Sequence, residues 1–312
     1  MNAAEHSVSI PRSAAHIQVP ATSANLGPGF DCLGLALALY NEIEIREIDR
    51  GLEFDIQGEG AAELPQDKTN YIVSAAQCIF DRVGYAPRGL FIRSVNGIPM
   101  SSGLGSSSAA IVGGLVAANL LTGSQLSRDQ VLALAVEIEG HPDNVVPAIL
   151  GGLVIAAVET EGPIINQINL PPLSVIAVTP DLRISTEEAR RILPTMVPRA
   201  DAIFNLSRTA LVIQALARGD FDLLSRVMND RLHQPYRKHL ITGYDYVIEA
   251  ARSAGAAAVA ISGSGPTLVA FAPDQHSEIA QAMQQAFKYN GVDSRAWILN
   301  VDRAGARAID SH

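Results

Sequence analysis

The sequence predicts an α+β protein of two domains, and three observations support this. The chain has 312 residues, which is enough for two ordinary domains with a core each. Segments that favour strands and segments that favour helices occur in both halves of the chain. Around residues 161–172 the chain is rich in Pro and Gly, which is typical of a domain boundary. We therefore expect one domain over residues 1–165 and another over residues 166–312.

In the first half, strands are expected at HIQVPATSAN, ending at Pro20, and in CLGLALALYNEIEIREI, LFIRSV and GGLVIAAV. Residues 69–83 have a helical pattern. Residues 106–121 are apolar on nearly every face, which predicts a buried helix. A third helix is expected at VLALAVEIEG, where Ser127 and Gln130 can form a capping box.

The second half is expected to begin with a strand at LSVIAVTP and to end with one at SRAWILNV. Between them, AAAVAISGSGPTLVAF has the pattern of two strands joined by a glycine turn. One helix is expected near Ser185, where Glu188 would complete a capping box. Further helices are expected at residues 202–218, 221–229, 244–254 and 276–287.

Composition excludes several classes of function. The net charge is −9 and no cluster of Lys or Arg occurs, so we expect no nucleic-acid partner. The N-terminal segment lacks the apolar stretch of a signal peptide. The longest apolar run, residues 109–118, is far shorter than the ~20 residues that span a bilayer, so no membrane partner is expected. Two cysteines, Cys32 and Cys78, show no metal or disulfide spacing, which fits a cytoplasmic protein with Cys32 buried.

The strongest chemical signal is the loop PMSSGLGSSSAAI at residues 99–111. Gly103 and Gly105 allow tight turns and positive φ, so backbone N–H groups can point toward an anion. A helix is expected directly after the loop, and its N-terminus offers free N–H groups and the positive end of the helix dipole. No P-loop lysine pattern occurs, so a phosphate site here would depend on backbone amides, serine hydroxyls and a metal ion. A flexible linker is the alternative, but a linker would not lead straight into a buried helix.

This loop resembles the ATP-binding signature of the GHMP family of small-molecule kinases, Pro-x-x-x-Gly-Leu-Gly-Ser-Ser-small-small. The resemblance implies an N-terminal domain similar to domain 2 of ribosomal protein S5 and a ferredoxin-like C-terminal domain. It implies that Asn70 contacts adenine and that a serine at the helix start, Ser107 or Ser106, ligates Mg²⁺. The ATP-binding residues of the loop would be Pro99, Met100, Ser101, Ser102, Gly103, Leu104, Gly105, Ser106, Ser107 and Ser108.

Four further stretches resemble motifs of one branch of that family, the homoserine kinases. In TSANLGPGFDCLGLAL, Asn25 and Asp31 match residues that contact homoserine, and a carboxylate suits its ammonium group. The Gly-Pro-Gly turn between them would let the backbone approach a ligand closely. A turn-forming Asn and a capping Asp are the structural alternative.

The second stretch is EGHPDNVVPAILGG. Glu139 matches the family's magnesium ligand, and a carboxylate is a natural ligand for that hard cation. The spacing to the histidine is shorter than in many homoserine kinases, so Glu137 stays open as the metal ligand. His141 and Asp143 match homoserine-contacting positions, and Asn144 accompanies them as a catalytic residue.

The third and fourth stretches are PDLRISTEEARRILP and HQPYRKHL. By resemblance, Thr186 would touch the reacting hydroxyl or the γ-phosphate as a catalytic residue. Arg190, one helical turn later on the same face, would bind the homoserine carboxylate together with Arg237. A guanidinium binds a carboxylate through two parallel hydrogen bonds, so an arginine pair suits this ligand. Gln234 stands where the family commonly has Glu, and SGSGPT should lend its backbone to the site.

Together these resemblances imply ATP-dependent phosphorylation of the side-chain hydroxyl of L-homoserine, a step in threonine biosynthesis, by a magnesium-dependent homodimer. The hydroxyl would attack the γ-phosphorus in line, and no residue is assigned as base. Two alternatives stay open. A GHMP kinase acting on an alcohol without an ammonium group would have no use for the acidic pair Asp31 and Asp143. A non-catalytic amino-acid or nucleotide sensor would be favoured by loss of the loop serines or the metal carboxylate, and the sequence retains both.

Overall fold

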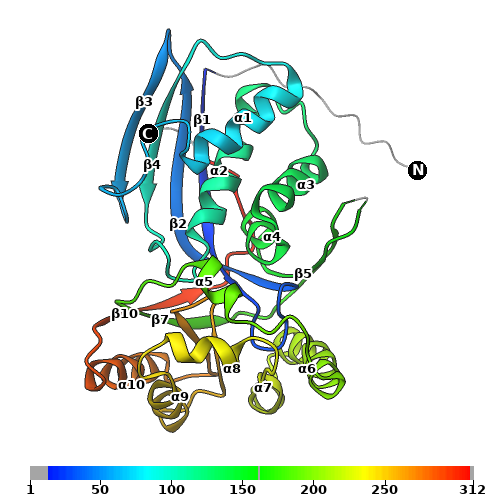
Figure 1. The fold of residues 1–312 in the computed structure, drawn as a ribbon, viewed down its shortest axis with the longest axis vertical. Helices are drawn as coiled ribbons and strands as arrows, with labels where there is room; N and C mark the ends of the chain where they lie inside the picture. The colour runs from blue at the N-terminus through cyan, green and yellow to red at the C-terminus, as the bar shows by residue number, and fades with distance from the viewer. Residues whose placement is uncertain (1–12, 161, 310–312) are drawn as a thin grey trace.

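The computed structural model describes residues 13–160 and 162–309, which form two α+β parts stacked along the long axis of the molecule (Figure 1). Each part has its own β-sheet, of seven and four strands. The segment at which we expect no signal peptide lies largely outside the described residues. Among the helices that the structure describes, none combines the length and the apolar character that a membrane span requires.

Two long antiparallel strands, β1 (Ala14–Ala24) and β2 (Leu33–Glu47), form the centre of the first sheet. Strand order is β11-β1-β2-β4-β3, and β5 and β6 extend from β2. The prediction that the first strand ends at Pro20 is wrong. The pairing register shifts between Pro20 and Ala21, and such an irregularity accommodates a residue that has no N–H to donate. The remaining strands are β3 (Gly51–Gly58), β4 (Gly89–Asn96), β5 (Leu153–Ala157), β6 (Ile164–Ile168) and β11 (Arg307–Ala308).

Helix α2 (Ser106–Leu121) is the buried helix of the first part, as predicted. It packs on β1 and β2 together with α4 (Pro142–Leu150), while α1 (Tyr71–Val83) packs on α2, and α3 (Arg128–Glu139) packs on α2 and α4 (Figure 1). Two adjacent glycines bring α2 close to its neighbours, because a Cβ on Gly113 would lie 2.1 Å from Ile43 and one on Gly114 would lie 2.4 Å from the carbonyl oxygen of Ile72. The helix is therefore fixed in position on two sides, and its N-terminus points toward the second part.

The second sheet has the order β10-β7-β9-β8, and its neighbouring strands are antiparallel. Helices connect β7 to β8 and β9 to β10, which is the ferredoxin-like βαββαβ arrangement. The strands are β7 (Ser174–Pro180), β8 (Ala258–Ile261), β9 (Leu268–Phe271) and β10 (Ser294–Asn300). The helices are α5 (Thr186–Arg191), α6 (Arg199–Arg218), α7 (Phe221–Val227), α8 (Gln234–Arg237), the 3₁₀ helix η1 (Lys238–Leu240), α9 (Tyr244–Ser253) and α10 (His276–Tyr289).

The two faces of the second sheet belong to different hydrophobic cores. Along β7, Ile176 and Val178 pack in a cluster with residues of α9 and α10. The alternate residues Val175 and Ala177 belong to a second cluster, which is continuous with the core of the first part. Because successive side chains of a strand point to opposite faces, this alternation places the sheet between the two cores. The core of the first part therefore continues onto one face of the second sheet, and this shared core joins the two parts.

The predicted two-domain α+β fold is confirmed, as are the helix over 106–121 and the capping box of Ser127 and Gln130. At the helix near Ser185, the hydroxyl accepts from the backbone N–H of Glu188. Strands β3, β6 and β11, helices α4 and α8 and the 3₁₀ helix η1 were not predicted. The expected boundary after residue 165 falls inside β6, which pairs with β5 of the first sheet, and this division of the chain stays a prediction.

Candidate active site

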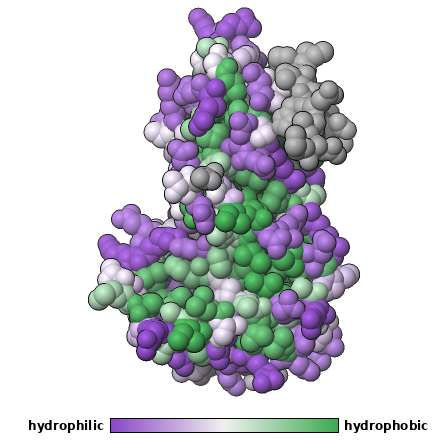
Figure 2. All heavy atoms as spheres, turned by 90° about the vertical axis from the view of Figure 1, so that its right-hand side faces the viewer, coloured by the Kyte–Doolittle hydropathy of each residue, from purple (hydrophilic) through white to green (hydrophobic). Residues whose placement is uncertain are grey.

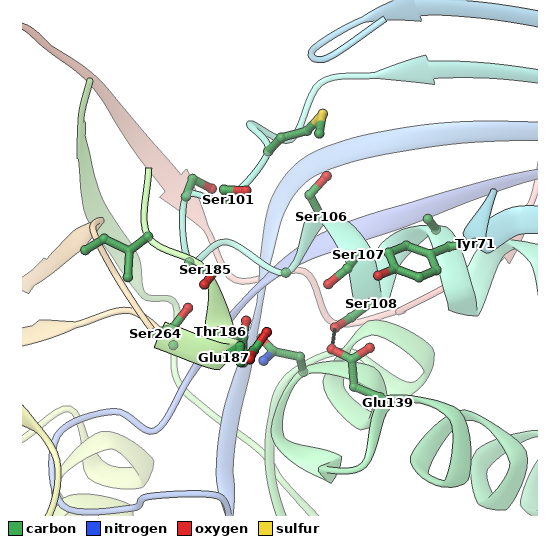
Figure 3. A pocket seen from close by; sticks show the side chains of 18 of the residues that line it. Tyr71, Ser101, Ser106, Ser107, Ser108, Glu139, Ser185, Thr186, Glu187 and Ser264 are labelled. Atoms are coloured by element: carbon green, nitrogen blue, oxygen red, sulfur yellow. Dashed lines mark hydrogen bonds between the residues drawn. The ribbon is translucent and has the colours of Figure 1, made fainter. Parts of the chain in front are cut away.

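A cavity of about 580 Å³ lies between the two parts and reaches the N-terminus of α2. Its wall draws on the glycine–serine loop, the start of α1, α4 and α5, and the turn between β8 and β9. Figure 3 shows Ser106, Ser107 and Ser108 at the start of α2, facing Thr186 and Glu187 of α5 across the cavity. Nearly all the residues singled out from sequence lie along this wall. Pro99 and Leu104 do not, and Leu104 is fully buried in the core.

The N-terminus of α2 is the clearest anion-binding feature of the cavity. Gly105 is the N-cap, and no side chain caps the helix. The first intrahelical bond is from the Ala109 N–H to the Gly105 carbonyl, so the amides of Ser106, Ser107 and Ser108 have no partner within the helix. Three free amides and the positive end of a sixteen-residue helix point into the cavity. The geometry suits a phosphate group.

The conformation of the loop depends on its glycines. Gly103 and Gly105 have φ values of 85° and 73°. A Cβ on Gly103 would lie 2.3 Å from the carbonyl oxygen of Ser262, and one on Gly105 would lie 2.1 Å from the Thr22 hydroxyl. The Ser262 hydroxyl donates to the Gly103 carbonyl at 2.7 Å, so the loop is also tied to the second part. Both glycines are required by close packing as well as by backbone conformation.

At one end of the cavity, Asn70 caps helix α1. Its Oδ1 accepts from the Ile72 N–H at 2.9 Å, and its Nδ2 donates to the Pro65 carbonyl at 2.8 Å. The side chain therefore shapes this end of the cavity by fixing the segment before α1. Pro65, Thr69, Tyr71, Ser94 and Asn96 line the same end, and no sequence signal identified them. The contact of Asn70 with adenine stays a prediction.

Glu139, the last residue of α3, lies beside the start of α2. Its Oε1 accepts from the Ser108 hydroxyl at 2.7 Å, drawn as a dashed line in Figure 3. Glu139 lines the cavity, whereas Glu137 does not. Ser107 is exposed to the cavity, and Ser108 is fully buried beneath it. No cluster of three or more His, Cys, Asp or Glu side chains suited to a metal is found in residues 13–160 and 162–309.

One carboxylate and neighbouring hydroxyls nevertheless fit Mg²⁺. This ion keeps several waters and takes one or two carboxylates together with substrate phosphates. The donor set around Glu139, Ser107 and Ser108 has this composition and adjoins the free amides of α2.

At the other end of the cavity, Asp31 and Arg190 form an ion pair. Arg190 Nη1 donates to Oδ2 of Asp31 at 3.0 Å and Nη2 donates to Oδ1 at 2.7 Å, so the pair is bidentate. Burial opposes the charge of Arg190, but the hydrogen bonds and charge of Asp31 outweigh it and raise the pKa of the guanidinium. Both side chains are about one-third exposed, 37% and 35%, and line the cavity. Two residues expected to contact opposite ends of one ligand are thus in contact with each other.

The loop that carries Asn25 and Asp31 has an unusual backbone. Asn25, Leu26 and Gly27 all have positive φ, as does Asp31. Asn25 is buried, donates to the Gly263 carbonyl at 2.9 Å and accepts from the Asp31 N–H at 3.0 Å, which fixes the loop. The Gly-Pro-Gly turn, expected to approach a ligand closely, lies against the segment of Met228. A Cβ on Gly27 would lie 2.6 Å from the Met228 carbonyl oxygen.

Arg237 is nearly fully buried, yet it lines the cavity. Burial and the nearby Arg190 lower the pKa of its guanidinium to about 10, so it stays charged at neutral pH. Both arginines lie near the ring of Phe30, whose centroid is 5.1 Å from Arg237 Cζ and 5.7 Å from Arg190 Cζ. A cation near an aromatic face is stabilised by the ring quadrupole, so Phe30 helps to hold two like charges near each other. Phe30 was not identified from sequence.

His141 and Asp143 begin helix α4 and point into the same end of the cavity. His141 Nδ1 and Asp143 Oδ1 are 3.0 Å apart. Burial acts to lower the pKa of His141, but the hydrogen bond and charge of Asp143 prevail and raise it. Asn144 accepts from the Thr22 hydroxyl at 2.8 Å, beside Gly105. Helix α4 was not expected from the sequence, although Pro142 is well suited to the first turn of a helix.

Comparisons with known proteins agree with this geometry. The model of the GHMP kinases N terminal domain matches residues 70–152, and that of the GHMP kinases C terminal domain matches residues 212–288. The fold and the site agree with this class: a glycine–serine loop and a free helix N-terminus face a cavity lined by charged side chains. The chain belongs to the GHMP kinase family.

Within that family the likeness is to the homoserine kinases. The chain is 46% identical to a homoserine kinase of Microchaete diplosiphon, over 96% of this chain and 98% of that one, and 43% identical to one of Desulfitobacterium hafniense, over 94% and 99%. The structure of a homoserine kinase from Cytophaga hutchinsonii superposes with a TM-score of 0.87 at 30% identity, over 96% and 98% of the two chains. A mevalonate kinase of L. major has a TM-score of 0.66 at 18% identity, which shows a shared fold.

Proposed function

We propose that this chain transfers the γ-phosphate of ATP to the side-chain hydroxyl of L-homoserine, forming O-phospho-L-homoserine. One observation carries the proposal: a single cavity joins the free N-terminus of α2 to the oppositely charged pair Asp31 and Arg190. The first feature suits a triphosphate and the second a zwitterion. Full-length similarity to homoserine kinases supports the same assignment.

In this proposal, L-homoserine replaces the Asp31–Arg190 ion pair with two ion pairs of its own. Its carboxylate takes Arg190 and Arg237, and its ammonium takes Asp31, with Asn25 nearby. His141 and Asp143 line the same end of the cavity and complete the amino-acid pocket. A hydroxy acid without an ammonium group would draw Arg190 away and leave Asp31 without a partner. The pocket therefore favours zwitterions over simple acids.

ATP would lie with its phosphates at the α2 N-terminus and its adenine toward Asn70. Mg²⁺, held by Glu139 and a serine of the loop, would neutralise charge on the phosphate oxygens when bound. Of the two serines left open by the sequence, Ser107 has the more exposed side chain. Glu139 is preferred to Glu137 because only Glu139 lines the cavity.

The residues of this chain act mainly by position and charge, as phosphoryl transfer requires. Thr186, at the N-terminus of α5, faces the start of α2 and can orient the homoserine hydroxyl toward the γ-phosphate (Figure 3). Asn144 is held by Thr22 next to Gly105 and keeps this part of the wall in place. No side chain is assigned as general base.

A coupled assay of ADP release tests the function. With ATP and Mg²⁺, we expect turnover with L-homoserine and little or none with L-serine, L-threonine or mevalonate. L-Serine is one methylene shorter, so its hydroxyl would not reach the phosphate when its charged groups are bound. Turnover with mevalonate equal to that with L-homoserine, or absence of ADP release with every acceptor, would refute the proposal.

We further propose that the protein is a homodimer through helix α6. Ile203, Leu206 and Leu211 form an exposed apolar stripe on this helix, and Met196 and Val197, also exposed, precede it in the chain. Figure 2 views this side and shows apolar side chains gathered over the second part. A stripe with helical spacing that no described part of the chain covers is typical of a surface that pairs with another copy.

A further inference from the structure

His233, the N-cap of α8, lies between two parts of the amino-acid pocket. Its side chain is fully buried. On one side its Nε2 is 2.8 Å from the carbonyl oxygen of Gly27, in the loop that carries Asn25 and Asp31. On the other side its Nδ1 is 3.3 Å from Nη1 of Arg237. One imidazole ring thus connects the loop to the arginine.

The chemistry of these neighbours determines the protonation of the ring. A carbonyl oxygen can only accept, so Nε2 must carry the hydrogen. A guanidinium can only donate, so Nδ1 must present its lone pair. His233 is therefore neutral and in the Nε2–H tautomer. Burial, the largest influence, lowers its pKa, which agrees with a neutral ring; Asp230 acts in the opposite direction, with Oδ2 3.6 Å from Nε2.

The ring itself is held from two directions. Phe30 stacks on it with a centroid distance of 5.1 Å. The carboxylate of Asp230 accepts from the backbone N–H groups of Leu232, His233 and Gln234 at 2.9, 2.9 and 2.6 Å. The N-terminus of α8 is fixed by these bonds, although the helix has only four residues. His233 therefore has little freedom to rotate.

Arg237 has limited freedom for the same reason. Its Nε donates to the Ala189 carbonyl at 3.1 Å, and its Nη1 donates to the Gly263 carbonyl at 3.0 Å as well as to His233. Within the described ranges 13–160 and 162–309, no hydrogen-bond partner is found for Nη2. Arg237 lines the cavity, so Nη2 is the nitrogen left for a ligand.

We propose that His233 is a positioning residue that fixes the Arg237 guanidinium relative to the loop of Asn25 and Asp31. Its Nε2–H donates to the loop at the Gly27 carbonyl, and its Nδ1 accepts from Arg237. The inference rests on the proposed function, in which Arg237 binds the homoserine carboxylate. His233 touches no substrate. It sets the distance between the site for the homoserine carboxylate and the site for its ammonium group. Loss of His233 therefore weakens the binding of homoserine and leaves the binding of ATP unchanged.

The protonation state can be tested without any assay of activity. In the full chain labelled with ¹⁵N-histidine, the His233 resonances are assigned by their absence from His233→Phe. We expect Nδ1 to be unprotonated and Nε2 protonated, at pH values on both sides of about 6.5, the ordinary histidine pKa. An imidazolium ion or the Nδ1–H tautomer at neutral pH would overturn the proposal.

A double-mutant cycle tests the function of the ring. His233→Phe keeps the stack on Phe30 and removes both hydrogen bonds. We expect it to raise the homoserine KM about tenfold or more, as for a lost hydrogen bond to a charged group, and to leave the ATP KM within about twofold. In an Arg237→Ala background, the same substitution should change the homoserine KM by less than about twofold, because its effect passes through Arg237.

Controls separate the possible failures. His239→Phe makes the same change at an exposed position nearby and should alter neither KM. If Arg237→Ala leaves the homoserine KM unchanged, the proposed role of Arg237 is wrong. Suppose instead that Arg237→Ala raises the homoserine KM, and that His233→Phe raises it by the same factor in the unsubstituted protein and in Arg237→Ala. Then the positioning role of His233 is wrong, and the role of Arg237 stands. Should His233→Phe fail to fold, His233→Leu, which also removes both hydrogen bonds but has a smaller side chain, replaces it in the same cycle.

Discussion

At the scale of single residues, the pocket satisfies its own charges. Asp31 and Arg190 come from separate parts of the chain and meet in a bidentate pair. A free aspartate or arginine in a half-buried pocket would be costly, and the pair avoids that cost until a ligand replaces it. A ligand with only one charge can satisfy only one of the two residues, so the pair itself contributes to selection between ligands.

Arg190→Ala tests whether the Asp31–Arg190 pair takes part in binding the substrate. We expect the homoserine KM to rise about 30-fold, which corresponds to about 2 kcal/mol, the lower end for loss of one partner of a charge pair. The lower end applies because both side chains are about one-third exposed. The ATP KM should stay within about twofold. Steady-state kinetics with each substrate varied in turn gives both values.

Arg191→Ala is the matched control, since Arg191 is exposed and does not line the cavity. An equal rise in the homoserine KM for both variants, or no rise for Arg190→Ala, would contradict the role of Arg190.

At the scale of elements, the site depends on how α2 begins. Gly105 has a positive φ, and the space for a Cβ is occupied by the Thr22 hydroxyl, which also donates to Asn144. The start of α2, strand β1 and helix α4 therefore meet at one glycine. Any side chain there would separate these three elements and displace the free amides of α2.

Gly105→Ala should consequently impair nucleotide binding more than stability. Strain at a positive φ costs about 1–2 kcal/mol, and the clash with Thr22 adds to it. We expect the ATP KM to rise at least about tenfold, one decade for each 1.4 kcal/mol of lost binding. Gly84→Ala provides the comparison, because Gly84 also has a positive φ but nothing lies within 4 Å of its Cβ position. The Gly84→Ala variant should have a lower thermal midpoint and an unchanged ATP KM. An unchanged ATP KM in Gly105→Ala would contradict the role of Gly105 in nucleotide binding.

Sequence patterns predicted most of these elements, and the reasons for the failures are physical. Helix α2 was predicted because its apolar composition is a local property of the chain. Helix α4 was missed because Pro142, Asp143 and Asn144 are residue types that also favour a turn, although Pro is favourable in a first helical turn. The site residues recognised from sequence belong to linear motifs. Phe30 and His233 were missed because their role exists only when distant segments come together.

At the scale of the whole molecule, two features join the parts across the cavity. Arg183 forms a bidentate pair with Glu63, and Arg295 forms one with Glu59. These pairs are partly exposed and contribute little to stability individually. They connect the segment between β3 and α1 to the second part beside the cavity. The shared apolar core is the stronger connection.

The apolar stripe on α6 is the proposed dimer contact, and Leu206→Glu tests it. A charge at Leu206, which is 72% exposed, should disrupt a dimer formed through α6 and halve the mass measured by sedimentation equilibrium. Tyr289→Glu, at an 84% exposed position on α10, should leave the mass unchanged. A mass of one chain for the unsubstituted protein would contradict the proposed homodimer.

The alternation along β7 has a consequence for how this enzyme can be taken apart. Val175 and Ala177 face the core of the first part, so a fragment ending before β7 would expose the surface that they cover, and the complementary fragment would expose Phe271. Each piece alone would present apolar area to water and tend to aggregate. The halves therefore cannot be exchanged with those of a distant relative as independent modules. In a functional chimera, the side chains on this face of the second sheet would have to fit the core of the first part.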